Sequence, residues 1–306
     1  MRNIELLVTV ESLEQLKKAV DCGANAVCVG GEVYGLQTNK ESISIEELKE
    51  GMEYAHKQNV KVYITVNIFA HNNDLPEVKK YLEEIKVVGP DALLIAEPGV
   101  FTIAKEVMPE VAIHIAPQAN NTNYVTYNFW AKLGVKRVAS ARELSLAEIT
   151  EIRKHVPEEL EIESFVHGSF CISYSGRQLV SNYLDKAAAD NKVSHKEPID
   201  TFGLVEVTRP DETMPVYENE RGTFIFNSKD LCMIEYLPDM IAAGINSLKI
   251  EGQINSDEYV ETAIKTYRRA IDDYNTSITL FMDNMASYKE ELEKVAERPF
   301  TTGFYL

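Results

Sequence analysis

The chain has 306 residues, with 48 acidic and 31 basic side chains and a formal net charge of −17. With 45% hydrophobic and 26% charged residues, it has the composition of a folded protein with one large α/β domain or two ordinary ones. The acidic balance excludes a protein that grips nucleic acid phosphates over a broad surface, because such binding needs clustered Lys and Arg. A local basic patch or a basic partner is compatible with it.

Three further features indicate the cellular compartment. No apolar run approaches the roughly 18 residues that a membrane helix needs. Strand-like sequence starts at Ile4, so we expect no signal peptide and no membrane contact. The four cysteines (Cys22, Cys28, Cys171 and Cys232) are too few and too scattered for a disulfide framework. We therefore expect a cytoplasmic protein.

Strand-like runs alternate with runs of helical periodicity along most of the chain. Residues 4–10 predict a strand, Ser12 caps the helix that follows, and residues 26–30 predict a second strand. Ser44 opens a capping box, SIEE, for the next helix. Further strands, each except the interrupted seventh followed by a helix, are expected at 61–67, 92–98, 112–119, 137–143, 161–168 and 247–252.

Strands that alternate with helices predict a parallel sheet, and eight such units favour a (β/α)8 TIM-like barrel over residues 1–275. A doubly wound sheet is less favoured because the GxGxxG turn of dinucleotide-binding folds is absent. Residues 169–228 are polar and predict a loop-rich insertion over the C-terminal mouth of the barrel, between the seventh and eighth strands. Residues 229–244 predict a helix, and residues 276–306 a C-terminal helical tail.

Polar residues gather at the expected C-terminal ends of the strands. The set is Gly30, Gly31, Asn67, Glu97, Gln118, Asn120, Asn121, Arg142, Glu143, His167 and Glu251. Any one of them could instead cap a helix or hold a loop in place through hydrogen bonds. Together they predict a pocket for a small anionic substrate, in which Arg142 offers a two-pronged fork for a carboxylate. The expected substrate-binding side chains are Asn67, Gln118, Asn120, Arg142 and Glu143.

His167 ends the seventh expected strand, and Cys171 follows four residues later. Such a pair can act as base and nucleophile or donate two metal ligands, and it can equally be a buried imidazole beside a buried thiol. A hydrolase built on this pair would use His167, Cys171 and the nearby carboxylates Glu163 and Glu251 as catalytic residues. The usual hydrolase and zinc signatures, GxSxG, HExxH and CxxC, are absent from the sequence.

Residues 163–184, ESFVHGSFCISYSGRQLVSNYL, resemble the signature of the collagenase-like peptidase family U32. Similar segments such as PQANNTN, ARELSLAEI and SLKIEGQINSDEYV extend the resemblance over roughly residues 1–275. Members of this family are described as peptidases of unassigned mechanism. Better-understood members hydroxylate tRNA, ribosomal RNA or ubiquinone precursors with a four-cysteine iron–sulfur cluster, and the RNA hydroxylases use prephenate as oxygen source. The resemblance adds Arg177 of the signature to the substrate-binding candidates.

The chain departs from the cluster-bearing members at the cysteines. It keeps Cys171 and Cys232, but Gln178 and Ser194 stand at the other two positions, and two thiolates do not hold a four-iron cluster. The resemblance therefore implies a chain without a bound cofactor of its own, whose two remaining cysteines are near neighbours. A zinc ion held by these cysteines and a histidine such as His195 is a lesser alternative.

Short chains of about this length resemble the first subunit (P1) of a two-subunit tRNA 5-hydroxyuridine system with a longer second subunit. Gln253 replaces the family's Arg after Lys-Ile-Glu-Gly, which also speaks against independent catalysis. The leading hypothesis is a non-cluster subunit that acts with a longer, cysteine-complete U32 paralogue on the wobble uridine of tRNA, with a small anion such as prephenate. The alternatives are a peptidase and a regulatory or assembly protein.

Overall fold

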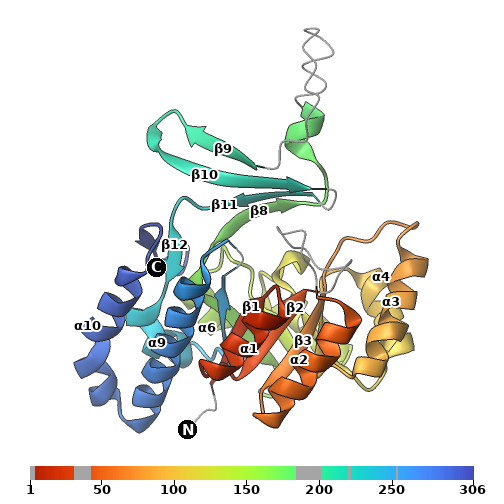
Figure 1. Cartoon of the computed structure of the whole chain (residues 1–306), viewed down its shortest axis with the longest axis horizontal. Coiled ribbons are helices and arrows are strands. Elements are labelled where there is room, and N and C mark those ends of the chain that lie inside the picture. The colour runs from red at the N-terminus through yellow and green to blue at the C-terminus, as the bar shows by residue number, and fades with distance from the viewer. Residues whose placement is uncertain (1–3, 31–42, 184–200, 220–221, 253) are drawn as a thin grey trace.

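The computed structural model describes residues 4–30, 43–183, 201–219, 222–252 and 254–306. Eight parallel strands form a closed barrel (Figure 1). The strands are β1 (Glu5–Val10), β2 (Ala26–Gly30), β3 (Lys61–Val66), β4 (Ala92–Ile95), β5 (Ala112–Ile115), β6 (Arg137–Ala139), β7 (Glu161–Gly168) and β13 (Ser247–Glu251). They follow the chain order around the ring, and β13 closes it by pairing with both β1 and β7. The predicted (β/α)8 barrel is confirmed.

Helices connect the strands and surround the barrel. They are α1 (Leu13–Asp21), α2 (Ile45–Lys57), α3 (Leu75–Val88), α4 (Pro98–Val107), α5 (Tyr124–Lys132), α6 (Leu146–His155), α8 (Leu237–Ala242), α9 (Asp257–Thr276) and α10 (Ile278–Lys294). Ser44 and Ser145 begin α2 and α6 with capping boxes, in which the serine and a glutamate three residues on satisfy each other's backbone N–H groups. None of the helices in the described ranges combines the length and the apolar character needed to cross a membrane.

The barrel strands are apolar because both of their faces are buried. Their outer faces pack against the helices. Their inner faces meet in a small cluster of Leu7, Ala26, Cys28, Tyr63, Ala92 and Leu94. At the N-terminal end of the barrel, Arg137 forms ion pairs with Glu5 and Glu161 and closes the interior with polar groups. The open end is therefore the C-terminal end, where barrel enzymes carry their sites.

The segment after β7 forms a small antiparallel sheet above this open end (Figure 1). Its strands lie in the order β8 (Cys171–Ser175), β11 (Gly222–Phe226), β10 (Arg209–Asn219) and β9 (Thr201–Glu206). The sequence predicts a loop-rich insertion with short strand-like runs such as GLVEV and FIF, and these runs lie in β9 and β11, whereas β10 was not predicted. Most residues of β10 are exposed or only partly buried, so its sequence, RPDETMPVYEN, lacks the regular apolar alternation that marks a half-buried strand.

The chain returns from the small sheet through β12 (Asp230–Cys232), which runs antiparallel to β7 and parallel to β14 (Phe300–Thr301). The prediction of one helix over 229–244 is wrong. Leu231 and Met233 are buried in the alternation of a strand, and only the turn η2 (Ile234–Tyr236) and α8 are helical.

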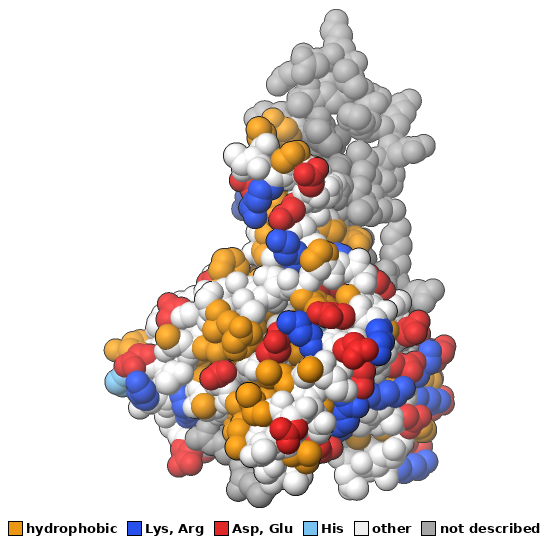
Figure 2. All heavy atoms as spheres, turned by 90° about the vertical axis from the view of Figure 1, so that its left-hand side faces the viewer, with side chains coloured by type: hydrophobic (Ala, Val, Ile, Leu, Met, Phe, Trp, Pro, Cys, Tyr) orange, Lys and Arg blue, Asp and Glu red, His pale blue; other side chains and the backbone are white. Residues whose placement is uncertain are grey.

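The C-terminal residues pack against the barrel. The helix α10 lies along α9, and the hydroxyl of Tyr305 donates a hydrogen bond to the carbonyl of Phe165 in β7. Figure 2 shows this side of the molecule, where hydrophobic side chains gather in the middle and basic side chains lie among acidic ones. This face therefore presents no broad, purely basic surface among the described residues.

Candidate functional site

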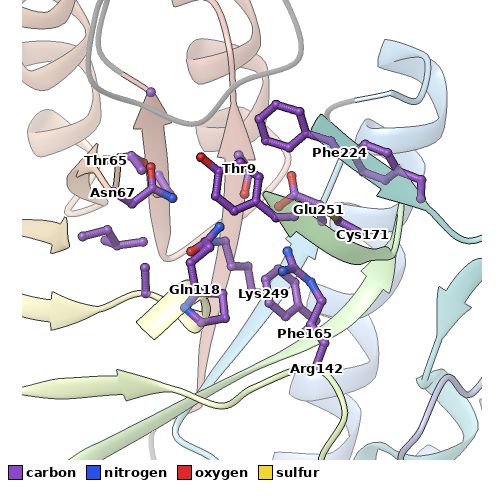
Figure 3. A pocket seen from close by; sticks show the side chains of 17 residues that line it. Thr9, Thr65, Asn67, Gln118, Arg142, Phe165, Cys171, Phe224, Lys249 and Glu251 are labelled. Atoms are coloured by element: carbon purple, nitrogen blue, oxygen red, sulfur yellow. The ribbon is translucent and has the colours of Figure 1, made fainter. Parts of the chain in front are cut away.

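A pocket opens at the C-terminal end of the barrel beneath the small sheet (Figure 3). It consists of an inner chamber of about 50 Å³ and an outer chamber of about 200 Å³. Both chambers are lined by Pro117, Gln118, Arg142, Cys171 and Tyr174. The floor comes from the barrel strands and the segments that follow them, and the roof comes from β8 and β11. The fold thus builds the predicted pocket from parts far apart in the sequence.

Lys249 is a buried cation at the floor of the inner chamber. Its Nζ lies 3.5 Å from Oε1 of Glu163, whose Oε2 lies 3.6 Å from Nη1 of Arg137 below. Burial alone would lower the pKa of Lys249, but the carboxylates of Glu163 and Glu251 favour the charged ammonium, and the pKa is raised. Lys249 is therefore charged, which suits it to hold an anion and not to react as an amine nucleophile.

Neutral polar groups surround this cation in the inner chamber. Cys28 Sγ lies 3.1 Å from Thr65 Oγ1. Burial raises the pKa of Cys28 above its ordinary value, so this thiol is protonated near neutral pH and is no nucleophile. Thr9 Oγ1 is buried and has no hydrogen-bond partner among the described residues. A polar ligand atom would satisfy it, because a buried polar group without a partner is costly.

Arg142 stands between the two chambers, in the segment that follows β6. Its guanidinium carbon lies 4.2 Å from the centre of the Phe165 ring, and this stacking holds the plane of the guanidinium. Arg142 Nε is buried and has no hydrogen-bond partner among the described residues. A carboxylate placed along the edge of the guanidinium would accept from this donor. The structure therefore places Arg142 in the position expected for an anion fork.

The outer chamber combines aromatic and polar walls. Phe69 and Tyr174 stack with their ring centres 5.7 Å apart and their planes 16° from parallel. Gln118, Asn120 and Glu143 form the polar wall, and Oε1 of Gln118 is buried with no hydrogen-bond partner among the described residues. From their shared placement at strand ends, we expect seven side chains to converge in one cleft: Asn67, Gln118, Asn120, Arg142, Glu143, His167 and Glu251. All except His167 line one of the two chambers.

His167 is the exception, because it points away from the pocket. In the pairing of β7 with β13, Phe165 lies opposite Lys249 and His167 lies opposite Ile250, so β7 has one extra residue at this point. Such a β-bulge reverses the side on which the following side chains project. His167 consequently packs against Tyr259 and Tyr267 of α9, and burial lowers its pKa to about 3.

The expected pairing of His167 with Cys171 is therefore wrong. Cys171 lies at the base of β8 and lines the pocket, where its thiol donates to the carbonyl of Ser173 at 3.4 Å. Burial raises the pKa of the Cys171 thiol, and none of the described residues that line the two chambers is a histidine that could take its proton. A thiol–imidazole nucleophile is not formed.

The second remnant cysteine, Cys232, also faces away from the pocket. It lies directly opposite His167 in the antiparallel pair of β12 and β7, so both side chains share the outward face. Its thiol lies 3.9 Å from the hydroxyl of Tyr267, and burial raises its pKa to about 11. The two remnant thiols thus have different surroundings: Cys171 lines the pocket, and Cys232 contacts Tyr267.

A four-iron cluster does not fit the side chains found here. No three His, Cys, Asp or Glu side chains within the described ranges are placed to hold a metal ion. Gln178 is exposed beyond β8. Ser194, His195 and Gln253 lie outside the described residues, so the structure does not test the alternative zinc site.

Four other sequence candidates have different surroundings. Arg177 is exposed and lines neither chamber, and its backbone carbonyl accepts a hydrogen bond from Thr223 Oγ1. Glu97 caps α4 by accepting from the backbone N–H groups of Gly99 and Val100. Asn121 is fully buried, and its side-chain amide donates to the carbonyl of Ala116 and accepts from Trp130 Nε1. Glu163 lies beneath Lys249 and does not line the pocket.

Several pocket residues were missed at the sequence level. They are Thr9, Cys28, Thr65, Phe69, Phe165, Tyr174, Phe224, Phe226 and Lys249. Lys249 had a usable signal, because it lies in the middle of SLKIE, an expected barrel strand with both faces covered, and lysine is almost never fully buried unless it is paired. The aromatic residues had no such signal, since aromatic side chains in strands usually pack in the hydrophobic core.

Comparison with known sequences identifies the family. The sequence profile of peptidase family U32 matches residues 11–306. The chain belongs to peptidase family U32. Among U32 relatives, tRNA hydroxylation protein P1 of Bacillus subtilis is 38% identical over 98% of this chain and 70% of its own length. The tRNA hydroxylation protein P2 of the same organism is 35% identical over 97% of this chain and 93% of its own length.

These shares of length bear on the subunit assignment. The P1 relative extends well beyond this U32 chain, whereas the P2 relative is nearly equal to it in length. The expectation that short chains correspond to the first subunit is therefore reversed in this pair. A solved U32 structure, that of the U32 peptidase Mk0906, has a TM-score of 0.51 at 13% identity over 82% of this chain and 93% of its own, which shows a common fold.

Proposed function

We propose that this U32 chain is a subunit of a complex that hydroxylates the wobble uridine of tRNA. The observation that carries the proposal is its similarity, over nearly its whole length, to two proteins named for tRNA hydroxylation. Because its proposed substrate is tRNA, we place the chain in the cytoplasm. Because the chain has a net charge of −17, it is unsuited to broad contact with the RNA backbone, and we assign that contact to the partner.

The pocket supports a binding role for this subunit. Hydroxylation at C5 of uracil replaces a C–H bond by a C–OH group and needs an oxygen donor. A small anion such as prephenate fits the chemistry of Arg142 and Lys249, one cation held by stacking and one by buried carboxylates. The iron–sulfur chemistry belongs to a longer, cysteine-complete U32 paralogue, because the described residues of this chain do not form a cluster site.

The peptidase alternative lacks the pair of catalytic residues that it requires. His167 lies on the outward face of β7, and Cys171 is a protonated thiol in the pocket. Glu251, the other member of the expected catalytic set that lines the pocket, lies beside the charged Lys249. No observation on the site favours peptide hydrolysis over binding of a small anion.

Deletion of the gene, followed by nucleoside analysis of total tRNA, tests the proposal. We expect 5-hydroxyuridine to be lost in the deletion strain and restored by the wild-type gene. Arg142→Ala should restore much less, because one charge-assisted bond contributes about 1.5–3 kcal/mol to binding. Arg209→Ala, at an exposed arginine of the small sheet, is the matched control. Unchanged 5-hydroxyuridine in the deletion strain would refute the proposal.

A further inference from the structure

The outer chamber has a property that the binding of a small anion does not use. Its aromatic wall is exposed to solvent, with 39% of the Phe69 surface accessible. Behind Phe69 the rings of Tyr174 and Phe224 continue the row, with centres 5.7 Å and then 4.9 Å apart. The row runs from the rim of the pocket toward the inner chamber, because Phe69 lines only the outer chamber and Phe224 only the inner one.

An exposed ring at the rim of a polar pocket is a platform for a flat ligand. Proteins that bind single-stranded nucleic acids use exposed aromatic rings in this way, because each base has a π face that stacks on them. Phe69 follows the buried strand β3 and is supported from behind by Tyr174, so the ring is held in place and not merely exposed.

The same chamber is also lined by polar side chains that can read the edge of a base. Gln118 and Asn120 carry amides, which both donate and accept hydrogen bonds, and Glu143 carries a carboxylate that accepts. Uracil presents two carbonyl acceptors and one N–H donor on its edge, and this pattern matches amide donors together with a carboxyl or amide acceptor. The buried Oε1 of Gln118, without a hydrogen-bond partner among the described residues, is such an acceptor.

The two chambers differ in size and charge, so they suit different ligands. The inner chamber, at about 50 Å³, is the smaller of the two and holds the buried cation Lys249. The outer chamber, at about 200 Å³, has room for one planar ring and opens to the surface. Arg142 lines both, so a ligand in one chamber lies next to a ligand in the other.

We infer that the outer chamber is a nucleobase site, in which an unpaired uracil base of single-stranded RNA stacks on Phe69 with its polar edge toward Gln118 and Asn120. The inference rests on the proposed function, and it locates the RNA base and the small anion in two adjoining chambers of one chain. Arg142 then lies between them.

Photo-cross-linking tests this placement directly. The chain is purified with its native partners from its own cells and mixed with an anticodon stem-loop RNA that carries 4-thiouridine at the wobble position. We expect the cross-linked peptide to contain residues 67–70 or 171–174. Cross-links only to other peptides, or to the partner alone, would overturn the inference while leaving tRNA hydroxylation by the complex intact.

Substitutions at Phe69 provide an independent measurement with the same complex. Phe69→Leu keeps an apolar side chain but removes the π face, and it should weaken binding of the stem-loop by about 5- to 150-fold. Phe69→Tyr should retain the affinity. Phe129→Ala, at a 53% exposed ring on α5 outside both chambers, is the control and should leave binding unchanged. Equal affinities for Phe69→Leu and wild type would contradict the nucleobase site, whereas loss of 5-hydroxyuridine in the deletion strain tests the proposed function separately.

Discussion

Gly168 and Glu251 approach each other so closely that a β-carbon on Gly168 would lie 1.9 Å from the carbonyl oxygen of Glu251. Gly168 also has a φ of +99°, which side chains other than glycine rarely adopt. This contact joins the ends of β7 and β13, where the barrel closes and the small sheet begins.

Gly168→Ala should therefore lower the free energy of unfolding far more than the same substitution does at a glycine that has only a left-handed backbone conformation. Gly134→Ala is the control, since Gly134 has a φ of +80° but no atom within 4 Å of an added β-carbon. The control should lose about 1–2 kcal/mol from conformation alone. Gly168→Ala should lose clearly more, or fail to fold. Urea denaturation of both variants measures this, and equal losses would contradict the steric argument.

The buried His167 predicts a pH dependence of stability. Its pKa is about 3 in the folded protein against an ordinary value of 6.5, so between these values the unfolded chain binds a proton that the folded chain does not. Folding stability contributed by the neutral imidazole is thus present above pH 6.5 and is lost as the pH falls toward 3. From pH 7.5 to pH 5 the loss should be about 2 kcal/mol.

His167→Phe keeps a ring among Tyr259, Tyr267 and Phe300 and removes the titrating group. When the pH is lowered from 7.5 to 5, the unfolding free energy of the wild type should fall by about 2 kcal/mol relative to that of this variant. Denaturation curves at both pH values test it. A constant difference would show that His167 is accessible to protons in the folded state.

The ion pair between Lys249 and Glu163 predicts strong coupling inside the barrel. Lys249→Met leaves the Glu163 carboxylate short of one of its two cations, and breaking a buried pair of this kind costs about 3–5 kcal/mol. Adding Glu163→Gln should recover part of this loss. A double-mutant cycle should therefore give a coupling of about 0.5–3 kcal/mol.

The matched control for this cycle is the exposed pair of Lys80 and Glu84 on α3, whose charged atoms lie 3.7 Å apart. Screening by water should leave that pair with little coupling. Strictly additive losses at Lys249 and Glu163 would mean that the floor of the pocket is not held by this charge pair.

The cysteine arrangement predicts the metal content. Cys171 faces the pocket and Cys232 faces Tyr267, so the purified chain should be colourless and should take up no stoichiometric iron during anaerobic reconstitution with iron and sulfide. Iron and sulfide analysis, with a cysteine-complete U32 paralogue as positive control, measures it. About four irons per chain would overturn the non-cluster assignment.

Periodicity in the sequence was sufficient for the barrel, because strands such as AVCVG and ALLI are apolar throughout and helices such as α1, α2 and α6 begin at capping serines. Placement at strand ends was sufficient for Arg142 and Gln118, since parallel strands bring their C-terminal ends together. Position along a strand was not sufficient for His167. A single extra residue in β7 reverses its direction, and a bulge leaves no mark in the apolar pattern.

The roof of the pocket was also beyond sequence patterns. Tyr174 and Phe224 face the pocket only because β8 and β11 pair with each other across an insertion of more than forty residues in the chain, with Phe224 opposite Tyr174. The family signature marks the sequence around Tyr174 but does not indicate which side of the strand faces the barrel.

Roof and floor are also attached to the molecule in different ways. The floor strands are held on both sides by neighbours in the closed ring, whereas the small sheet joins the barrel through two adjacent strands, with Asn227 bonded back to the carbonyl of Phe170 at their base. Ligand entry and ligand recognition are consequently assigned to separate segments of the sequence. We expect substitutions in β8 and β11 to change mainly the rates at which a ligand enters and leaves the pocket. Substitutions at Lys249 should change the equilibrium affinity for the ligand, so that residence time and affinity can differ separately between relatives.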